Sequence, residues 1–154
     1  MDNDVLARHH AEIDERICKL LLRADGGDCH DLASEWNLLE GELSRHFELE
    51  EHEVFPLFER ENAEEVAALR QEHAALKRDL LALGIRADLH FLRAEAVRDF
   101  VRDLRAHSHR EDETLYRWAA KYLQPGTWAK IAATLNHVVH AVGHAVDDLG
   151  SPTL

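Results

Sequence analysis

The stretch LSRHFELEE, residues 43–51, recurs with several substitutions as LRAHSHRED, residues 104–112. Both stretches fit the pattern Leu-x-x-His-x-x-x-Glu followed by an acidic residue, and they are offset by 61 residues. A spacing of four places the histidine over the glutamate on one face of a helix. We therefore predict that the two stretches lie on two helices and hold a two-metal site inside a helical bundle.

The composition is ordinary for a helical globular protein. Hydrophobic residues make up 45% and charged residues 31% of the 154 residues, a length typical of one domain. The formal net charge of −12 argues against nucleic acid and membranes as partners. Twelve histidines are an excess of the commonest metal-binding side chain. Without a signal-peptide pattern or a Cys-x-x-Cys motif, we expect a cytoplasmic protein whose Cys18 and Cys29 are reduced.

Apolar residues recur at spacings of three and four along five segments, which predicts an all-α fold. The first four helices should form an antiparallel up-down-up-down four-helix bundle, with an additional C-terminal fifth helix outside it or at an oligomer contact. We assign the bundle to residues 1–124, and the accessory helix and tail to 125–154 of the same domain. Pro56 should kink or end the second helix, and Gly84 should end the third. The expected helices span residues 4–23, 31–57, 62–84, 94–123 and 127–149.

Two further histidines extend the repeat to the remaining helices. His10 on the first helix and His73 on the third are offset by 63 residues and replace aliphatic positions on their apolar stripes. Buried carboxylates are costly unless paired, and no lysine or arginine shares their stripes, so a cation is the simplest partner. Mixed imidazole and carboxylate ligands favour iron, with manganese or zinc possible. The predicted metal ligands are His10, His46, Glu50, His73, His107 and Glu111.

Each of these residues also has a purely structural interpretation. A lone core histidine is usually a hydrogen-bonded core residue, and a lone His-x-x-x-Glu pair usually faces solvent. His9 should be peripheral. Glu51 and Asp112 could orient a ligand imidazole or could lie on a solvated helix edge. The fifth helix carries a row of three histidines, His137, His140 and His144. This row could bind another metal, respond to pH at a subunit contact, or be an exposed polar face.

One histidine each on the first and third helices, and His-x-x-x-Glu on the second and fourth, resembles the hemerythrin-like family, or HHE cation-binding domain. Residues 46–56, HFELEEHEVFP, are similar to its second-helix signature, and the resemblance covers about residues 4–123. It implies a non-haem di-iron centre with an oxo, hydroxo or water bridge, bridging Glu50 and Glu111, and an open position for a small molecule. Oxygen carriers place a second histidine one turn after the third-helix histidine, where this chain has Lys77.

The missing histidine implies a more open site, which favours chemistry, sensing or iron exchange over reversible oxygen storage. The main functional hypothesis is a di-iron protein that binds or senses oxygen or nitric oxide. The alternatives are a peroxide-handling or metal-centre-repair enzyme, in which Tyr116 and Tyr122 could relay electrons, and an iron- or zinc-binding storage or structural protein. The fifth helix could form a homodimer. Catalytic residues are not assigned from the sequence.

Overall fold

The computed structural model describes the backbone of residues 5–26 and 29–147, and the side chains of residues 5–26 and 31–136. Every regular element within these ranges is a helix, which confirms the all-α prediction. The elements are α1 (Val5–Gly26), α2 (Cys29–Leu49), the π-helical segment η1 (Glu50–Val54), α3 (Phe55–Phe58), α4 (Ala63–Asp88), α5 (Ala94–Glu113), α6 (Leu115–Tyr122) and α7 (Pro125–Asp147).

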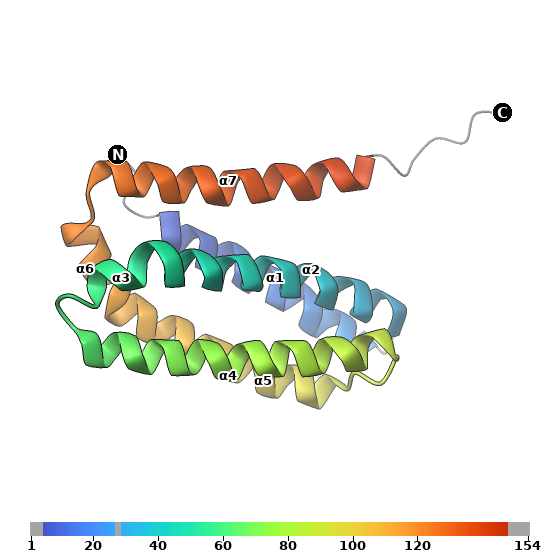
Figure 1. The fold of residues 1–154 in the computed structure, drawn as a ribbon. Helices are drawn as coiled ribbons and strands as arrows, with labels where there is room; N and C mark the ends of the chain where they lie inside the picture. Colours follow the sequence, from blue (N-terminus) through green and yellow to red (C-terminus); the bar gives the residue numbers. More distant parts are fainter. Residues whose placement is uncertain (1–4, 27–28, 148–154) are drawn as a thin grey trace.

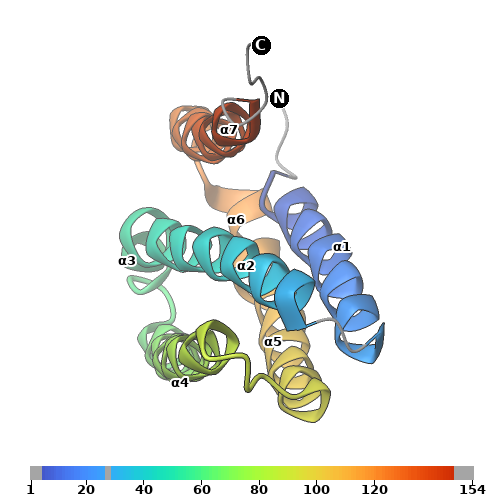
Figure 2. The same cartoon turned by 90° about the vertical axis from the view of Figure 1, so that its right-hand side faces the viewer.

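Four long helical units run side by side around one core (Figure 1). They are α1, then α2 with η1 and α3, then α4, then α5 with α6. Each unit contacts the next along the chain, and α5 closes the ring against α1. Figure 2, a view turned by 90°, shows α1, α2, α4 and α5 around the bundle axis with α7 outside them. This is the predicted up-down-up-down bundle with an additional helix.

The second unit changes its hydrogen-bonding pattern just before Pro56. In η1 the Phe55 N–H donates to the carbonyl of Glu50, five residues back. Pro56 then lies in the first turn of α3, where its missing N–H costs no helical hydrogen bond. The predicted disturbance at Pro56 therefore takes the form of a π-helical segment, and the helical path continues to Phe58.

The fourth unit is interrupted at the matching place in the repeat. Thr114 lies between α5 and α6, and its φ and ψ angles are −116° and −76°. The Thr114 hydroxyl donates to the carbonyl of Arg110 at 2.8 Å, a type of bond that bends helices. Both interruptions thus occur within about one turn of the repeated glutamates, Glu50 and Glu111.

The π-helical segment shifts the buried stripe of α3 by one residue, because an extra residue in a turn rotates everything that follows. The distorted backbone at Thr114 changes the buried face of α6 in a similar way. In α3 the predicted core residue Leu57 is only half-buried, and Phe58 is buried instead. In α6 the predicted core residue Tyr122 is 49% exposed, Trp118 is half-buried, and Tyr116 is 8% exposed. The next apolar residues after the glutamates, Val54 and Leu115, are buried as the spacing predicts, so the sequence-based stripes were wrong only further along, at Leu57 and Tyr122.

The third unit, α4, begins where predicted and ends later. The Asn62 side chain accepts a hydrogen bond from the Glu65 N–H at 3.1 Å, which confirms the N-cap. The prediction that Gly84 ends the helix was wrong. The end comes at His90, whose φ of 60° closes a Schellman turn. Gly84 is instead a packing residue, because a β-carbon there would approach an oxygen of Glu40 to 2.7 Å.

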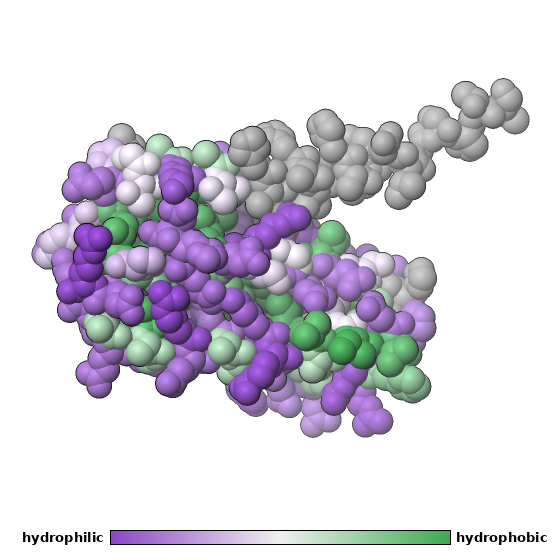
Figure 3. All heavy atoms as spheres, viewed as in Figure 1, coloured by the Kyte–Doolittle hydropathy of each residue, from purple (hydrophilic) through white to green (hydrophobic). Residues whose placement is uncertain are grey.

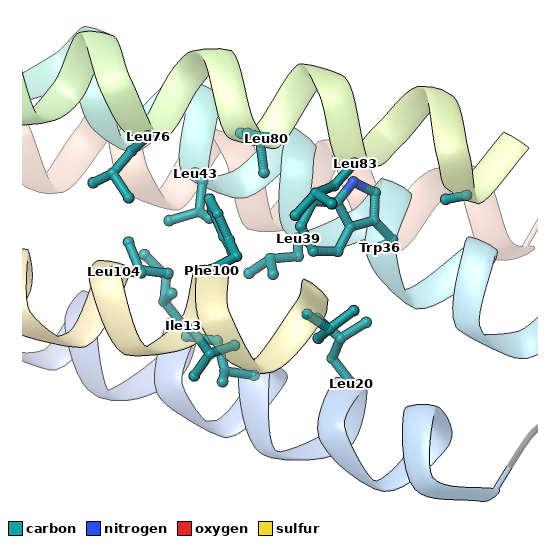
Figure 4. Packing of buried hydrophobic residues seen from close by; sticks show 14 of the residues in the cluster. Ile13, Leu20, Trp36, Leu39, Leu43, Leu76, Leu80, Leu83, Phe100 and Leu104 are labelled. Atoms are coloured by element: carbon teal, nitrogen blue, oxygen red, sulfur yellow. The ribbon is translucent and has the colours of Figure 1, made fainter. Parts of the chain in front are cut away.

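The larger of two hydrophobic clusters fills the half of the bundle near the α1–α2 and α4–α5 connections. Figure 4 shows side chains from all four helices pointing toward one another there, among them Leu20, Trp36, Leu80 and Phe100. The Trp36 and Phe100 rings meet edge to face with centroids 5.3 Å apart. This half supplies much of the apolar burial that stabilises the fold.

The smaller hydrophobic cluster fills the other half, and a polar layer separates the two. Along α1, Leu6 belongs to the smaller cluster, His10 to the polar layer and Ile13 to the larger cluster. The other three units show the same order of cluster, polar residues and cluster. The polar layer is therefore closed off along the bundle axis by hydrophobic side chains on both sides.

The first half of α7 completes the smaller cluster. Trp128, Ile131 and Leu135 are buried, and α7 contacts both α1 and α2. The predicted histidine row, His137, His140 and His144, has side chains outside the described residues. The predicted homodimer through this helix stays a prediction.

The outer surface is mainly hydrophilic on the face that Figure 3 shows, apart from a hydrophobic area toward the end of α4. Leu81, Ile85 and Leu89 form an exposed stripe there, followed by the exposed Phe91. Among the described residues, no helix has both the length and the apolar character needed to cross a membrane.

Candidate metal centre

Six titratable side chains meet in the polar layer between the two clusters. Four helical units contribute to it, and the layer holds two carboxylates that are entirely buried, Glu50 and Glu111. Isolated charges at such a depth would be strongly destabilising, so the layer needs a compensating partner. The six residues are those predicted from the sequence, His10, His46, Glu50, His73, His107 and Glu111.

The two repeated pairs have the same internal geometry. His46 Nε2 lies 3.1 Å from Glu50 Oε1, and His107 Nε2 lies 2.9 Å from Glu111 Oε1. Both pairs have the i, i+4 spacing, which brings the two side chains together on one helix face. The prediction that each histidine stands over its glutamate inside the bundle is thereby confirmed.

The two lone histidines face the same carboxylates from the opposite helices. His10 Nε2 lies 3.1 Å from His46 Nε2 and 3.6 Å from Glu111 Oε1. His73 Nε2 lies 3.3 Å from Glu50 Oε2 and 3.7 Å from Glu111 Oε2. All four imidazoles therefore direct Nε2 inward.

The inward atoms divide into two sets that share both carboxylates. Within each set, one ligand atom from each side chain lies within 4.8 Å of the others. Two ions joined by shared carboxylates need this arrangement, with terminal imidazoles on either side. One set is His10, His46, Glu50 and Glu111, and the other is Glu50, His73, His107 and Glu111.

Carboxylates hold the outward nitrogens of His73 and His107. His73 Nδ1 lies 3.0 Å from Glu51 Oε1, and Lys77 contacts both oxygens of Glu51 at 2.8 Å. His107 Nδ1 lies 2.7 Å from Glu72 Oε2. Such carboxylate–imidazole pairs fix the ring orientation and raise the basicity of the inward nitrogen. Glu51 thus has the orienting contact that the sequence suggested, and Lys77 balances its charge.

The outward nitrogens of the other two histidines meet different partners. His10 Nδ1 lies 3.3 Å from Asp112 Oδ1, the second orienting contact that the sequence suggested. His46 Nδ1 lies 2.8 Å from His9 Nδ1. The peripheral role predicted for His9 was wrong, since it is 7% exposed and lies directly behind His46. Burial and the charges on His46 and His10 lower the pKa of His9 to about 3, so His9 is neutral and its Nδ1 can accept a hydrogen bond from the His46 Nδ1–H.

In the protein alone, the two central carboxyls differ in charge. Burial and the Glu50 charge raise the pKa of Glu111 well above its ordinary value. Burial also acts to raise the pKa of Glu50, but His46 and His73 outweigh it and hold that pKa well below its ordinary value. Burial opposes a charge on His73, yet its interactions with Glu111 and Glu50 raise the pKa of His73 to about 9. Protons on Glu111 and His73 thus compensate part of the negative charge that a bound cation would otherwise neutralise.

A buried tyrosine adds an oxygen to one of the two sets. The Tyr116 hydroxyl donates to Glu50 Oε1 at 2.5 Å, and its oxygen lies 2.7 Å from His10 Nε2 and 3.3 Å from His46 Nε2. Burial and the Glu50 charge raise the pKa of Tyr116 well above its ordinary value, so the phenol is neutral in the protein alone.

A surface cavity of about 320 Å³ reaches the His10 side of the layer. His10 and Asp112 line it together with Arg105. A second cavity, of about 200 Å³, is lined in part by His9. A small molecule could therefore reach the set that contains His10 without unfolding of the bundle.

The donors fit a pair of metal ions. Five of their buried atoms approach one another to between 2.9 and 3.7 Å without forming a hydrogen bond of good geometry: Glu50 Oε2, His73 Nε2, His107 Nε2, and both carboxylate oxygens of Glu111. Unsatisfied polar atoms are rare in protein cores, and here they gather at one point and face one another. They belong to residue types that bind iron, manganese or zinc.

Comparison with protein families gives an independent result. A family model described as Hemerythrin HHE cation binding domain matches residues 1–120, more than three quarters of the chain. The chain belongs to this family. The match confirms the resemblance seen in the sequence, and the buried histidine and glutamate sets give the HHE domain a place to hold a cation. Neither the curated proteins nor the solved structures searched contain a match.

Sequence reasoning did not place three residues at this HHE site: His9 was predicted to be peripheral, Tyr116 was named only as a possible electron relay, and Glu72 was not named. The apolar pattern selected His10 rather than the adjacent His9 as the inward-facing histidine. Only the structure shows that both side chains are turned inward. Glu72 precedes His73 and faces His107 on another helix, which no spacing within α4 indicates. Tyr116 lies five residues after Glu111, a spacing that faces the core only because of the interruption at Thr114.

Proposed function

We propose that the chain is a non-haem di-iron protein that binds or senses a small molecule such as oxygen or nitric oxide. His10 and His46 would hold one ion, and His73 and His107 the other. Glu50 and Glu111 would bridge them. Bound iron would supply a redox-active centre with coordination positions open to a small ligand.

The sharing of both carboxylates between two otherwise separate histidine pairs supports this proposal. A single metal site would need only one of the sets. A purely structural layer would satisfy its polar atoms within the protein, whereas here the unsatisfied atoms face one another. A mixture of imidazole and carboxylate donors favours iron over hard cations such as magnesium and calcium, which prefer oxygen ligands.

The surrounding residues create conditions suited to a small, uncharged ligand. The Phe47 ring lies 4.4 Å from that of His73, centroid to centroid, and the Phe55 ring lies 5.0 Å from the same imidazole. These rings exclude water from the His73 side. The cavity beside His10 and Asp112 provides the approach for a diatomic molecule.

Metal analysis and visible spectroscopy test the proposal. Freshly purified protein should contain close to two iron ions per chain. The visible absorption of the reduced protein should change when oxygen or nitric oxide is added. A protein with bound iron and unchanged spectra under both gases would refute the sensing function, and a protein that takes up no iron would refute the di-iron centre.

Peroxide handling is the second candidate, and the polar lining of the approach favours it. Asp112 is largely exposed, contacts His10, and lines the same cavity, so it could carry protons between solvent and the centre. An iron-loaded protein with this activity would decompose peroxide faster than free iron does. Asp112→Asn should then slow the reaction while the iron content is unchanged; equal rates for the two proteins would remove this candidate.

A further inference from the structure

Tyr116 is within ligand distance of one of the two proposed ion positions. Its oxygen lies 2.5, 2.7 and 3.3 Å from Glu50 Oε1, His10 Nε2 and His46 Nε2. Ligand atoms at roughly 2.1 Å from one ion lie about 3 Å from their neighbours in an octahedral arrangement. The phenol oxygen therefore lies at the spacing from Glu50, His10 and His46 that a further ligand of the same cation would have.

The other ion position has an apolar group at the equivalent place. Tyr116 lies five residues after Glu111, and Phe55 lies five residues after Glu50. Tyr116 stacks over His10 with ring centroids 4.7 Å apart, and Phe55 lies 5.0 Å from the ring of His73. The two halves of the site thus match in position and differ in chemistry, because only Tyr116 carries an oxygen.

An irregularity in the helix turns the Tyr116 side chain toward the site. In a regular α-helix a residue five positions after Glu111 points well away from it. The interruption at Thr114 brings Tyr116 back onto the face of Glu111, where it is buried. The π-helical segment does the same for Phe55. A backbone irregularity of this kind beside a site often has a functional reason.

We infer that the Tyr116 oxygen is a fifth protein ligand for the ion held by His10 and His46. The inference rests on the proposed di-iron function. The Tyr116 phenol would lose its proton to solvent when a cation is bound, and its oxygen would become a ligand without any change of oxidation state. A bound cation stabilises the anion that burial alone disfavours. One ion then has five protein ligands and the other four.

The phenolate determines which metal the site prefers. A hard, anionic oxygen favours trivalent iron over softer or less charged ions. The same donor makes the two positions inequivalent, because the ion held by His10 and His46 would have one protein ligand more than the ion held by His73 and His107.

Resonance Raman spectroscopy of the ferric-loaded full chain tests the inference. Phenolate bound to ferric iron gives a visible charge-transfer band, and excitation in that band enhances tyrosine ring vibrations. The chain has two tyrosines, so Tyr122→Phe is a matched control. The vibrations should be present in the wild type and in Tyr122→Phe. They should be absent from Tyr116→Phe, which should keep its helical circular dichroism and its iron.

Three results would overturn the inference. The first is wild-type protein with two irons and no enhanced tyrosine vibrations, which would leave the di-iron function intact. The second is loss of the vibrations in Tyr122→Phe. This result counts even if Tyr116→Phe does not fold. The third is failure of the wild type to bind iron, which would also remove the proposed function.

Discussion

Removing the metal should destabilise the fold, and Glu111→Gln should abolish that dependence. The ligands come from four helical units and converge only in the folded chain, so metal binding favours the folded state. Glutamine has nearly the shape of a protonated glutamate but cannot bridge two cations as an anion. Because the pKa of Glu111 is raised well above its ordinary value, its carboxyl is neutral without metal, and the substitution should then change little.

The expected magnitude follows from linkage. A ligand present at 100 to 1,000 times its Kd stabilises by about 2.7 to 4.1 kcal/mol per site, or roughly 5 to 8 kcal/mol for two ions. At about 2 °C or more per kcal/mol for a chain of this length, the Tm should fall by at least about 10 °C on metal removal. Without metal, the wild type and Glu111→Gln should differ by less than about 1 kcal/mol.

Thermal unfolding followed by circular dichroism measures both effects, with and without a chelator. Glu48→Gln, at an exposed position on α2, is the matched control and should behave as the wild type. An unchanged Tm after verified removal of bound metal would refute the reasoning. So would Glu111→Gln protein that keeps the full metal-dependent shift, because the bridging carboxylate would then be unnecessary.

Three further predictions concern protons, ligand orientation and packing. Metal binding near pH 7 should release about three protons per chain in a weakly buffered titration: from Glu111, from His73 with its pKa of about 9, and from the Tyr116 phenol as it becomes a ligand. Metal affinity should rise as the pH approaches 9, and a pH-independent affinity would contradict this. Glu51→Gln should weaken metal binding about 10- to 100-fold, because it loosens the hold on His73, while Glu48→Gln should leave the affinity unchanged. Leu39→Ala, in the larger hydrophobic cluster, should lower the free energy of unfolding by about 2 to 5 kcal/mol in denaturant titrations without changing the metal count.

The sequence alone was sufficient for the fold class and for the six inward-facing side chains. Apolar residues at spacings of three and four define the helices, and helix geometry places His46 over Glu50 and His107 over Glu111 without any tertiary information. The offset of about 61 residues between the halves indicated that the pairs meet. These are local properties, so periodicity is enough to predict them.

Helix ends and helix interruptions were less predictable. Gly84 has a strong local signal for a helix end, but α4 continues through it to Asp88, and the positive φ that closes the helix is at His90. The π-helical segment before Pro56 and the break at Thr114 have no signature in the apolar spacing, because spacings of three and four assume a regular α-helix. A single extra residue in a turn was enough to misplace the buried stripe that follows.

The sequence therefore determined that two histidine–glutamate pairs and two lone histidines face one core. Only the tertiary structure determined which side chains contact these six residues. Contacts between helices, such as Glu72 with His107 or His9 with His46, have no periodic signature because they join residues more than 30 positions apart. The position of Tyr116 also has no periodic signature, because it follows the break at Thr114, after which its oxygen lies 2.7 Å from His10 Nε2 on another helix.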